Sequence, residues 1–256
     1  MDSDRTEEEG TPLPDVAARQ GHAGAHARGV RAMFDRIAPT YDSLNRALSF
    51  GIDARWRVRA VTALLDGLPP GPVLDLCAGT LDLSVVIAAR AAGRHIVAVD
   101  LSPEMLARGA AKVRQLDLDV EARVGDATAL ELPDGHFAGV IAGFGIRNVS
   151  VTESAAREVK RVLAPGGRFV TLEFFRPERA VTRLFHATYA TALLPAVGGL
   201  ISRDRGAYRY LAASMKGFLS RGEYESLLAR AGFERVRGED LLLGIASVVC
   251  GERGAS

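Results

Sequence analysis

The feature that most constrains the fold is a short apolar segment, a glycine-containing turn, a helical pattern and a second apolar segment ending on an acid. Residues 71–84 read GPVLDLCAGTLDLS, and residues 96–100 read IVAVD. This order is typical of two parallel strands joined by a helix, whose carboxyl ends border a ligand crevice. We therefore predict an α/β fold with a nucleoside site at that edge of the sheet.

The residues of this unit indicate which nucleoside binds. Gly79 has no Cβ, so a ligand can approach the backbone there, and Thr80 lies where the N-cap of the next helix is expected. Asp100 lies where a carboxylate can accept hydrogen bonds from both ribose hydroxyls. A dinucleotide needs G-x-G-x-x-G, whereas this loop offers Gly79 alone. S-adenosylmethionine fits better, although an ordinary strand-turn-helix ending on an acid is the alternative.

Length and charge narrow the class of protein. The 256 residues can bury the core of one α/β domain, and the 32 basic and 31 acidic residues nearly cancel, so no nucleic-acid surface is expected. The two cysteines lie far apart, and the first residues lack the basic and apolar parts of a secretory signal. We expect a protein of the cytoplasm without a transmembrane helix, because the apolar segment 193–201 is too short to span a bilayer.

Strands and helices alternate along the chain, which predicts a mostly parallel sheet. Residues 1–29 are expected to form a flexible tail, residues 30–251 a single domain that begins with a helical arm, and residues 252–256 a C-terminal tail. The expected later elements are strands at 121–124, 137–142, 168–174, 233–237 and 241–249, helices from 103, at 154–163 and from 220, and a helical insert at 177–216. Ser102 is the expected N-cap of the first of these helices, Pro165-Gly166-Gly167 is expected to end the second, and Ser220 with Glu223 is expected to form a capping box at the start of the third. The last two strands would form an antiparallel hairpin, with a turn at Gly238-Glu239-Asp240.

Several longer motifs resemble one known family. They are YDSLNRALSFGIDARW, VLDLCAGTLDLS, AVDLSPEML, GDATALELPDGHF, GFGIRNV, RVLAPGGRFVTLEF and YRYLAASMKGF, and they extend from about Phe34 to Gly251. With them the chain resembles the class I S-adenosylmethionine-dependent methyltransferases of UbiE/MenG type, which C-methylate quinol rings in menaquinone and ubiquinone biosynthesis. The resemblance implies a Rossmann-like, mostly parallel seven-stranded sheet with an antiparallel C-terminal hairpin.

The resemblance also implies cofactor-binding residues. These are Gly79, Thr80, Asp100, Asp126, Ala127 and Gly143. Three positions depart from the family, which usually has Gly at Leu81, often Ser at Gly143 and often His at Asp53. Leu81 would be strained at positive φ, and Gly143 leaves only its backbone to bind.

Methyl transfer from a sulfonium needs positioning and desolvation and no metal ion. The only H-x-x-x-H spacing, His22 with His26, lies in the expected tail, so no metal site is predicted. Arg147 and Asn148 are the candidate catalytic donors beside an ionising quinol oxygen. The alternative is loop structure, with Asn148 capping the next segment and Arg147 pairing with an acid. Glu173 is a candidate base.

Aromatic residues near the expected crevice have two interpretations. Tyr41, Tyr208 and Tyr210 could line the ring pocket or simply pack in the core, and Trp56 is assigned to packing.

The predicted substrate partner is a prenylated quinol, naphthoquinol or benzoquinol, whose tail is received by the insert around Leu184 to Ile201. Since such a lipid resides in the bilayer, transient peripheral membrane contact is expected, and a homo-oligomer is left open. The first alternative is a methyltransferase of secondary metabolism. The second is a non-catalytic protein that binds S-adenosylmethionine, which Leu81 and Gly143 favour.

Overall fold

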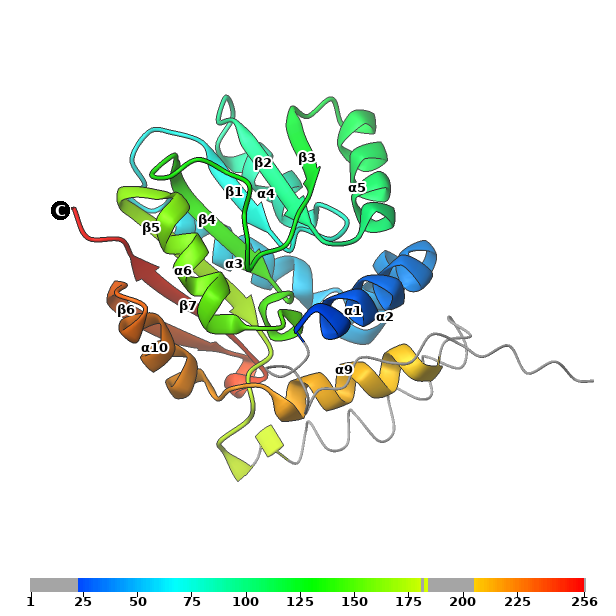
Figure 1. Cartoon of the computed structure of the whole chain (residues 1–256). Helices are drawn as coiled ribbons and strands as arrows, with labels where there is room; N and C mark the ends of the chain where they lie inside the picture. Colours follow the sequence, from blue (N-terminus) through cyan, green and yellow to red (C-terminus); the bar gives the residue numbers. More distant parts are fainter. Residues whose placement is uncertain (1–22, 181, 184–204, 256) are drawn as a thin grey trace, which may run out of the picture.

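A central seven-stranded sheet organises the computed structural model, which describes residues 23–180, 182–183 and 205–255. The strand order is β3-β2-β1-β4-β5-β7-β6 (Figure 1). The strands are β1 (Val73–Leu76), β2 (Ile96–Asp100), β3 (Val120–Val124), β4 (Phe137–Gly143), β5 (Leu163–Glu173), β6 (Glu234–Leu241) and β7 (Ala246–Glu252). The first five pair in parallel, and β7 pairs antiparallel with both β5 and β6, which confirms the predicted sheet.

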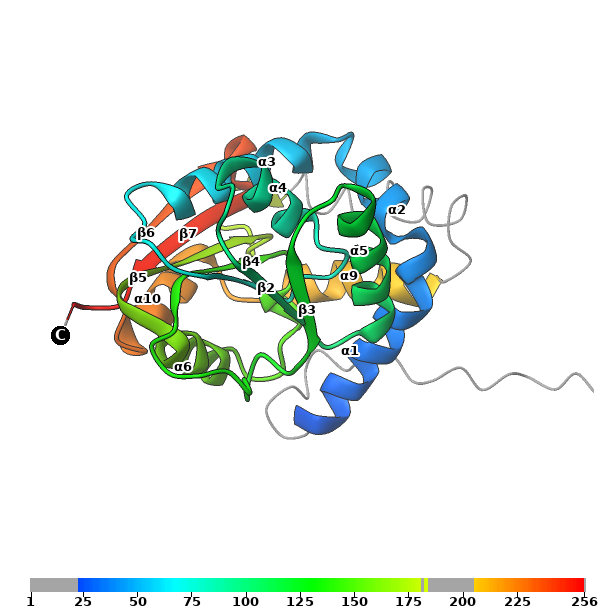
Figure 2. The ribbon, with the colours of Figure 1, turned by 90° about the horizontal axis from the view of Figure 1, so that it is seen from above.

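Helices cover both faces of this sheet and its carboxyl end. They are α1 (Ala23–Ile37), α2 (Tyr41–Ser49), α3 (Ile52–Leu65), α4 (Asp82–Arg90), α5 (Pro103–Gln115), α6 (Thr152–Val162), α9 (Arg205–Gly217) and α10 (Arg221–Arg230), with short 3-10 turns η1 (Ala38–Thr40), η2 (Ile146–Asn148) and η4 (Leu242–Gly244). Figure 2 shows α3 and α4 on one side of the sheet and α6 on the other. The α1, α2 and α9 helices lie together beyond the carboxyl ends of the central strands (Figure 1).

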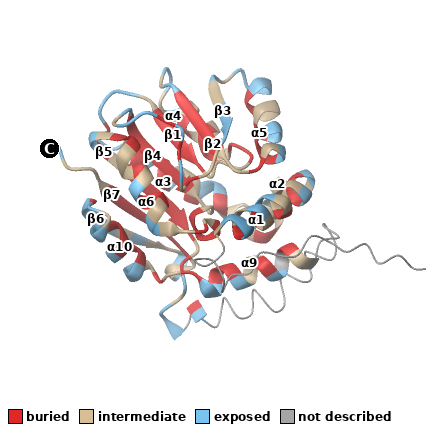
Figure 3. Cartoon of the chain, in the orientation of Figure 1, coloured by how far each residue is buried: buried red, intermediate tan, exposed pale blue. Residues whose placement is uncertain are grey.

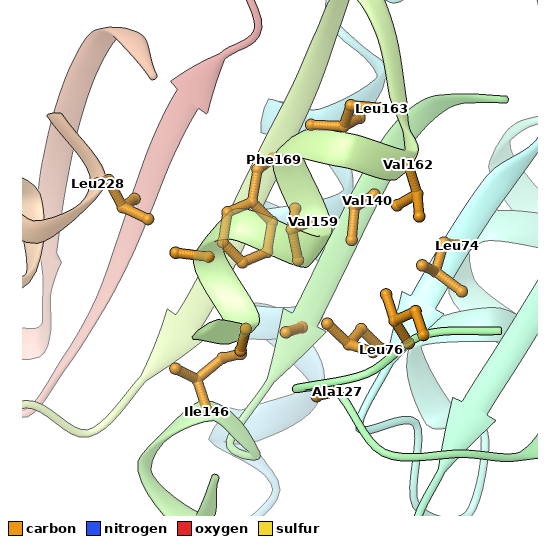
Figure 4. Close-up of a cluster of buried hydrophobic side chains, with 14 of the residues drawn as sticks. Leu74, Leu76, Ala127, Val140, Ile146, Val159, Val162, Leu163, Phe169 and Leu228 are labelled. Atoms are coloured by element: carbon orange, nitrogen blue, oxygen red, sulfur yellow. The ribbon is translucent and has the colours of Figure 1, made fainter. Parts of the chain in front are cut away.

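Burial explains why the central strands read as almost continuous apolar runs. β1 and most of β4 are buried on both faces, as is typical of parallel strands covered by two helical layers, whereas the edge strands β3 and β6 are largely exposed (Figure 3). Figure 4 shows one face, where Leu74, Val140 and Phe169 of the sheet meet Val159 of α6 and Leu228 of α10. Each such side chain contributes about 1.5–3 kcal/mol when it is removed from water.

Two helix starts follow their predicted caps. The Ser102 hydroxyl accepts a hydrogen bond from the Met105 N–H at the start of α5, where Pro103 occupies the first turn. Ser220 and Glu223 form the predicted capping box of α10, in which each side chain accepts from the backbone N–H of the other residue.

The structure corrects the predicted ends of the chain. The α1 helix begins at Ala23, so the boundary of the tail at residue 29 was wrong, and His26 of this helix is buried. Residues 1–22 lie outside the described residues. At the other end, β7 continues through Glu252, and the N–H of Arg253 donates to the carbonyl of Gly167, so residues 252–253 are not a tail.

Two glycines that were predicted to lie between elements, Gly167 and Gly238, lie inside strands. Gly238 lies inside β6 instead of in a turn, and a Cβ there would come within 2.2 Å of Oε1 of Glu225 on the packed α10 helix. The connection to β7 is made by η4. Gly167 lies inside β5, where a Cβ would approach the carbonyl oxygens of Ala164 and Ala138 within 3 Å. Both glycines permit close packing, which is a different use from chain reversal.

Among the helices of the described residues, none combines the length and the hydropathy needed to cross a bilayer.

Candidate active site

A pocket at the carboxyl ends of β1, β2 and β4 brings together five of the six predicted cofactor residues. Its walls include Gly79, Asp100, Asp126, Ala127 and Gly143, and α1 and Tyr41 close it from outside. We call this the cofactor pocket. At Gly79 the backbone has φ +54°, and a Cβ there would meet no atom within 4 Å, so the loop leaves open space beside its backbone.

Asp100 is held in the cofactor pocket by the backbone. The N–H of Gly79 donates to Oδ2 at 2.8 Å, and the N–H of Ser102 donates to Oδ1 at 2.8 Å. Burial raises the pKa of Asp100, while these backbone N–H groups act to lower it. Because each carboxylate oxygen can accept more than one hydrogen bond, both remain able to bind a vicinal diol such as that of ribose.

The structure places Thr80 beside the pocket, behind its wall. Its hydroxyl donates to Oδ1 of Asp42 on α2 at 2.6 Å, and the N-cap of α4 is Leu81, so the expected capping role of Thr80 was wrong. Lys112 of α5 bonds Asp42 at 2.9 Å and Asp82 of α4 at 2.5 Å. Although partial burial acts to raise it, the Thr80 hydroxyl and the Lys112 ammonium hold the pKa of Asp42 below its usual value. These bonds connect the N-terminal arm to the cofactor loop.

Asp75 of β1 lines neither cavity but supports the start of α4 beside the cofactor pocket, and the sequence reasoning missed it. It is fully buried, and its Oδ2 accepts from the Ser84 N–H at 2.9 Å and from the Ser84 hydroxyl at 2.7 Å. Burial raises the pKa of Asp75 to about 7, against the effect of these hydrogen bonds. The available signal was an acid inside the apolar run VLDL, because a buried carboxyl needs a partner. The Asp75 carboxyl group fixes the first turn of α4 against β1.

Of the three departures from the family pattern, Leu81 and Gly143 lie near the cofactor pocket, and neither places a side chain in it. Leu81 does have positive φ, +63°, which costs about 1–2 kcal/mol for a residue with a Cβ, yet its fully buried side chain packs against Gly109 of α5 and away from the pocket. At Gly143, a Cβ would lie 2.7 Å from Cδ1 of Leu83. Leu83 therefore occupies the space that a side chain at position 143 would need.

A second, larger cavity of about 270 Å³ adjoins the first. Most of its wall is apolar, and it is formed by α1, α2, α3, α9, the loop after β4 and η4; we call it the apolar cavity. Phe34, Tyr41, Phe144 and Asn148 line both cavities. The two cavities therefore meet at a common wall.

The apolar cavity contains an aromatic cluster. The rings of Phe144 and Phe174 stack at 4.7 Å between centroids, and Trp56 lies 6.1 Å from Phe174 in an edge arrangement. Asp53, where the family often has His, also lines this cavity, with its carboxylate bonded to the Ser49 hydroxyl at 2.6 Å and to Arg57. Stacked rings and aliphatic walls suit a flat, apolar ligand.

Arg147 lines the apolar cavity and pairs with an acid, as its alternative interpretation proposed. Its Nη1 donates at 2.5 Å to Oε1 of Glu173 and to the carbonyl of Phe144, and the guanidinium lies over the Phe174 ring at 5.7 Å. Nε is buried and has no hydrogen-bond partner among the described residues. Glu173, the candidate base, is fully buried at the end of β5 and lines neither cavity.

Asn148 lies where the two cavities meet. Its side chain does not cap α6, whose N-cap is Val151 and has no side-chain bond. Oδ1 is buried without a hydrogen-bond partner in the part of the chain that the structure describes. A buried amide group that lines two cavities and keeps an unused polar atom is suited to bind a ligand.

The structure settles part of the tyrosine assignment. Tyr41 and Tyr210 both line the apolar cavity, and burial raises the pKa of Tyr41. The Tyr208 side chain and the segment Leu184 to Ile201 lie outside what the structure describes. Within the described ranges, no three His, Cys, Asp or Glu side chains gather as a metal site would need.

Comparison with known sequences identifies the family. A profile of the ubiE/COQ5 methyltransferase family matches residues 22–253. The chain belongs to the ubiE/COQ5 methyltransferase family. As a member of it, the chain is a methyltransferase that uses S-adenosylmethionine, and the open backbone at Gly79 with the carboxylate of Asp100 fits that cofactor.

Two relatives within the ubiE/COQ5 family match nearly the whole chain. A demethylmenaquinone methyltransferase of Thermus thermophilus is 45% identical, over 86% of this chain and 100% of the relative. The ubiquinone/menaquinone biosynthesis C-methyltransferase UbiE of Syntrophotalea carbinolica is 42% identical, over 87% of this chain and 93% of the relative.

Solved structures show the same fold at low sequence identity. A methyltransferase of Thermotoga maritima, described as a possible histamine N-methyltransferase, has a TM-score of 0.63 at 20% identity and covers 88% of this chain and 99% of its own. Phosphoethanolamine N-methyltransferase 2 of Haemonchus contortus, in complex with S-adenosyl-L-methionine, has a TM-score of 0.57 at 16% identity. The match covers 83% of this chain and 59% of the Haemonchus chain. The fold of this ubiE/COQ5 member is thus that of class I methyltransferases.

Proposed function

We propose that the chain transfers the methyl group of S-adenosylmethionine to a ring carbon of a prenylated quinol, a naphthoquinol or a benzoquinol, in respiratory quinone biosynthesis. The observation that carries this proposal is the common wall between the cofactor pocket and the larger apolar cavity. In-line transfer needs a donor and an acceptor that approach each other across one short gap without intervening water. The names of the relatives support the choice of substrate.

The residues of the chain divide the work between the two cavities. S-adenosylmethionine supplies an electrophilic methyl group on a sulfonium. Asp100 holds the ribose hydroxyls, and the Gly79 backbone lets the donor lie against the loop. Phe144 and Tyr41 exclude water from the common wall. The quinol ring lies in the apolar cavity, with part of its tail against the aliphatic side chains of α2 and α9.

Arg147 and Asn148 act on the quinol oxygen in this proposal. A ring carbon becomes nucleophilic when the neighbouring hydroxyl releases its proton to solvent, and a fixed donor beside that oxygen stabilises the charge. The new ring C–CH₃ bond forms as the S–CH₃ bond of the donor breaks, and the ring C–H proton then leaves to solvent as aromaticity returns. Arg147 keeps a donor at Nε beyond those used by Glu173 and the Phe144 carbonyl. The unused Asn148 atom is Oδ1, an acceptor, so it orients the neutral quinol hydroxyl by accepting its hydrogen bond. Glu173 orients Arg147 and does not reach the ring itself.

A direct assay tests the proposal. The purified protein is incubated with S-adenosylmethionine and a chemically reduced, prenylated demethylnaphthoquinol or the matching benzoquinol, and methylated lipid is measured by mass spectrometry. We expect methylation of at least one ring, with KM falling as the tail lengthens, because each buried CH₂ contributes about 0.8 kcal/mol. Cofactor binding without any methylated product would favour the non-catalytic alternative. Turnover that is indifferent to the tail would favour a small-molecule substrate.

The cytoplasmic location and the oligomeric state stay predictions. An enzyme of a bilayer-resident quinol works at a membrane surface, so the inner face of the membrane is the location that the proposed function implies.

A further inference from the structure

Three large apolar side chains are exposed at the mouth of the apolar cavity. Phe50, at the end of α2, is 78% exposed, and Leu242 and Leu243, in η4 after β6, are 51% and 68% exposed. Phe50 and Leu242 both line the apolar cavity, so two segments far apart in the sequence meet at its opening. We call these three residues the apolar rim.

The backbone of the apolar rim is unusual as well. The φ angles of Phe50, Leu242 and Leu243 are +51°, +45° and +59°. This left-handed region is disfavoured for residues with a Cβ, and glycine or asparagine would adopt it more readily in an exposed turn. A turn that serves only to reverse the chain would therefore carry neither strain nor exposed apolar surface. Backbone outliers that present such side chains are expected at functional positions.

Unpaired positive charge accompanies the apolar rim. Arg46 lies one helical turn before Phe50 on α2, and Arg55 lies in the first turns of α3 just after it; both are exposed. Neither guanidinium makes a hydrogen bond or ion pair with another described residue, whereas the acids close to η4, Glu239 and Asp240, are paired with arginines. The edge of the cavity mouth thus combines apolar side chains with free cations.

We propose that the apolar rim inserts into the interfacial layer of an anionic lipid bilayer, with Arg46 and Arg55 at the headgroups, so that the apolar cavity opens directly into lipid. Apolar side chains beside unpaired arginines are the combination that binds such surfaces. The biological purpose of this surface rests on the proposed function. A prenyl tail that passed directly from the bilayer into the cavity would avoid water, whose contact with each methylene is unfavourable.

A second copy of the chain fits the apolar rim less well than a bilayer does. A stable interface between proteins buries about 800 Å² on each partner. Three partly exposed side chains provide well under that area, and the adjoining Arg46 and Arg55 of two copies would repel each other. An anionic bilayer needs no shape complementarity, and it attracts both arginines.

Vesicle flotation tests the proposal, and the chain offers a matched control. The control is Leu116→Ser, because Leu116 is a leucine with 52% exposure beside the opposite sheet edge, at the end of α5 next to β3. We expect Phe50→Ser/Leu243→Ser to lower partitioning onto phosphatidylglycerol vesicles by about tenfold or more, and the control to change it less than about twofold. Equal partitioning of wild type and the rim variant, or equal loss in the control, would overturn the proposal.

The two arginines are tested in the same flotation assay, and folding is tested separately. Arg46→Gln/Arg55→Gln is expected to weaken binding to phosphatidylglycerol vesicles by about fivefold for each charge and to leave binding to pure phosphatidylcholine unchanged. Melting temperatures verify that every variant is folded. If wild type sediments as a dimer that the rim variant dissociates, while vesicle binding stays unchanged, the surface joins two copies and the lipid proposal fails.

Partitioning requires no turnover, so its result is independent of the proposed chemistry. Rim-dependent vesicle binding without methylation of any quinol would sink the proposed function and leave the surface in place. If both proposals hold, Leu243→Ser turns over a short-tailed quinol in solution as wild type does and loses several-fold on a long-tailed quinol in vesicles. Wild-type turnover by Leu243→Ser on the vesicle-borne substrate would count against the surface.

Discussion

The cofactor pocket and the apolar cavity share a wall but are built on different principles. In and beside the pocket, carboxylates are held by backbone N–H groups: Gly79 and Ser102 donate to Asp100, and Ser84 donates to Asp75. At the cavity, Arg147 of η2 lines the wall and pairs with Glu173 at the end of β5 behind it, while helical side chains form most of the remaining wall. Glu173 also accepts from the backbone N–H groups of Arg147 and Phe174, so backbone contacts support this pair from behind the wall. In the proposed function, cofactor recognition therefore depends on the path of the backbone, whereas quinol recognition depends mainly on side chains that can be exchanged without changing the fold.

Among substitutions that test this comparison, we expect the largest loss of stability at Arg147. Arg147→Ala leaves Glu173 as an unpaired buried charge, so we expect the free energy of unfolding to fall by about 3–5 kcal/mol. Arg147→Met/Glu173→Gln removes both charges and should recover most of this loss. Urea unfolding measures both changes.

Activity of the same variants then separates the two roles of Arg147. In the proposed function, the stable double variant loses roughly tenfold to a thousandfold in kcat, because the quinol oxygen has lost its donor. A kcat close to that of wild type in the folded double variant would make the pair purely structural.

Asp75, beside the cofactor pocket, should make the stability of the protein depend on pH. Because its pKa is raised to about 7, the folded state keeps this proton after the unfolded state has lost it, so stability declines as pH rises and levels off above pH 7. The difference in unfolding free energy between wild type and Asp75→Asn should change by about 1.4 kcal/mol per pH unit between pH 5 and 7. Parallel stability curves from urea titrations would show that Asp75 is ionised throughout.

Asp100→Ala tests the pocket through binding. Two ribose hydroxyls lose a carboxylate acceptor, so affinity for S-adenosylmethionine should fall by about 2 kcal/mol in calorimetry. Asp119→Ala, at an exposed acid next to β3, is the control and should bind as wild type does. Equal affinity in the Asp100 and Asp119 variants would remove Asp100 from the cofactor site.

The smallest effect concerns Gly143. Gly143→Ser introduces a Cβ at 2.7 Å from Cδ1 of Leu83, and the shift of Leu83 should cost about 1 kcal/mol of stability. In Gly143→Ser/Leu83→Val the second substitution should add little or no further loss, because the crowding atom is gone. A stability loss in which the two single effects simply add would show that residues 143 and 83 are independent.

The parts of the fold that local sequence determines were predicted well. Strand β2 was predicted at its observed bounds, Ile96–Asp100, because a buried apolar run ends there on a polar residue. The capping box of α10 was predicted for the same reason, since its bonds join residues three positions apart. Gly238 misled the prediction because a glycine inside a strand that packs against side chains of α10 has the same local sequence as a glycine in a turn.

The same distinction between local and long-range determinants applies to the candidate site. Gly79 and Asp100 lie 21 positions apart within one strand-helix-strand unit, so their meeting follows from a local motif. The pairing of Arg147 with Glu173 depends on β4 lying beside β5, and the apolar cavity depends on how α1, α2 and α9 dock over the sheet. Spacing along the chain carries no information on such docking.

The position of Trp56 has a spectroscopic consequence. It is the only tryptophan of the chain, and its indole lies in the wall of the apolar cavity, near Phe144 and Phe174. The intrinsic indole emission of the protein therefore originates beside the acceptor cavity, and a ring that enters this cavity comes within contact range of the emitter. In the proposed function the cofactor fills the cavity that Trp56 does not line, so we expect a quinol to change the indole emission of the unlabelled protein more than the cofactor does.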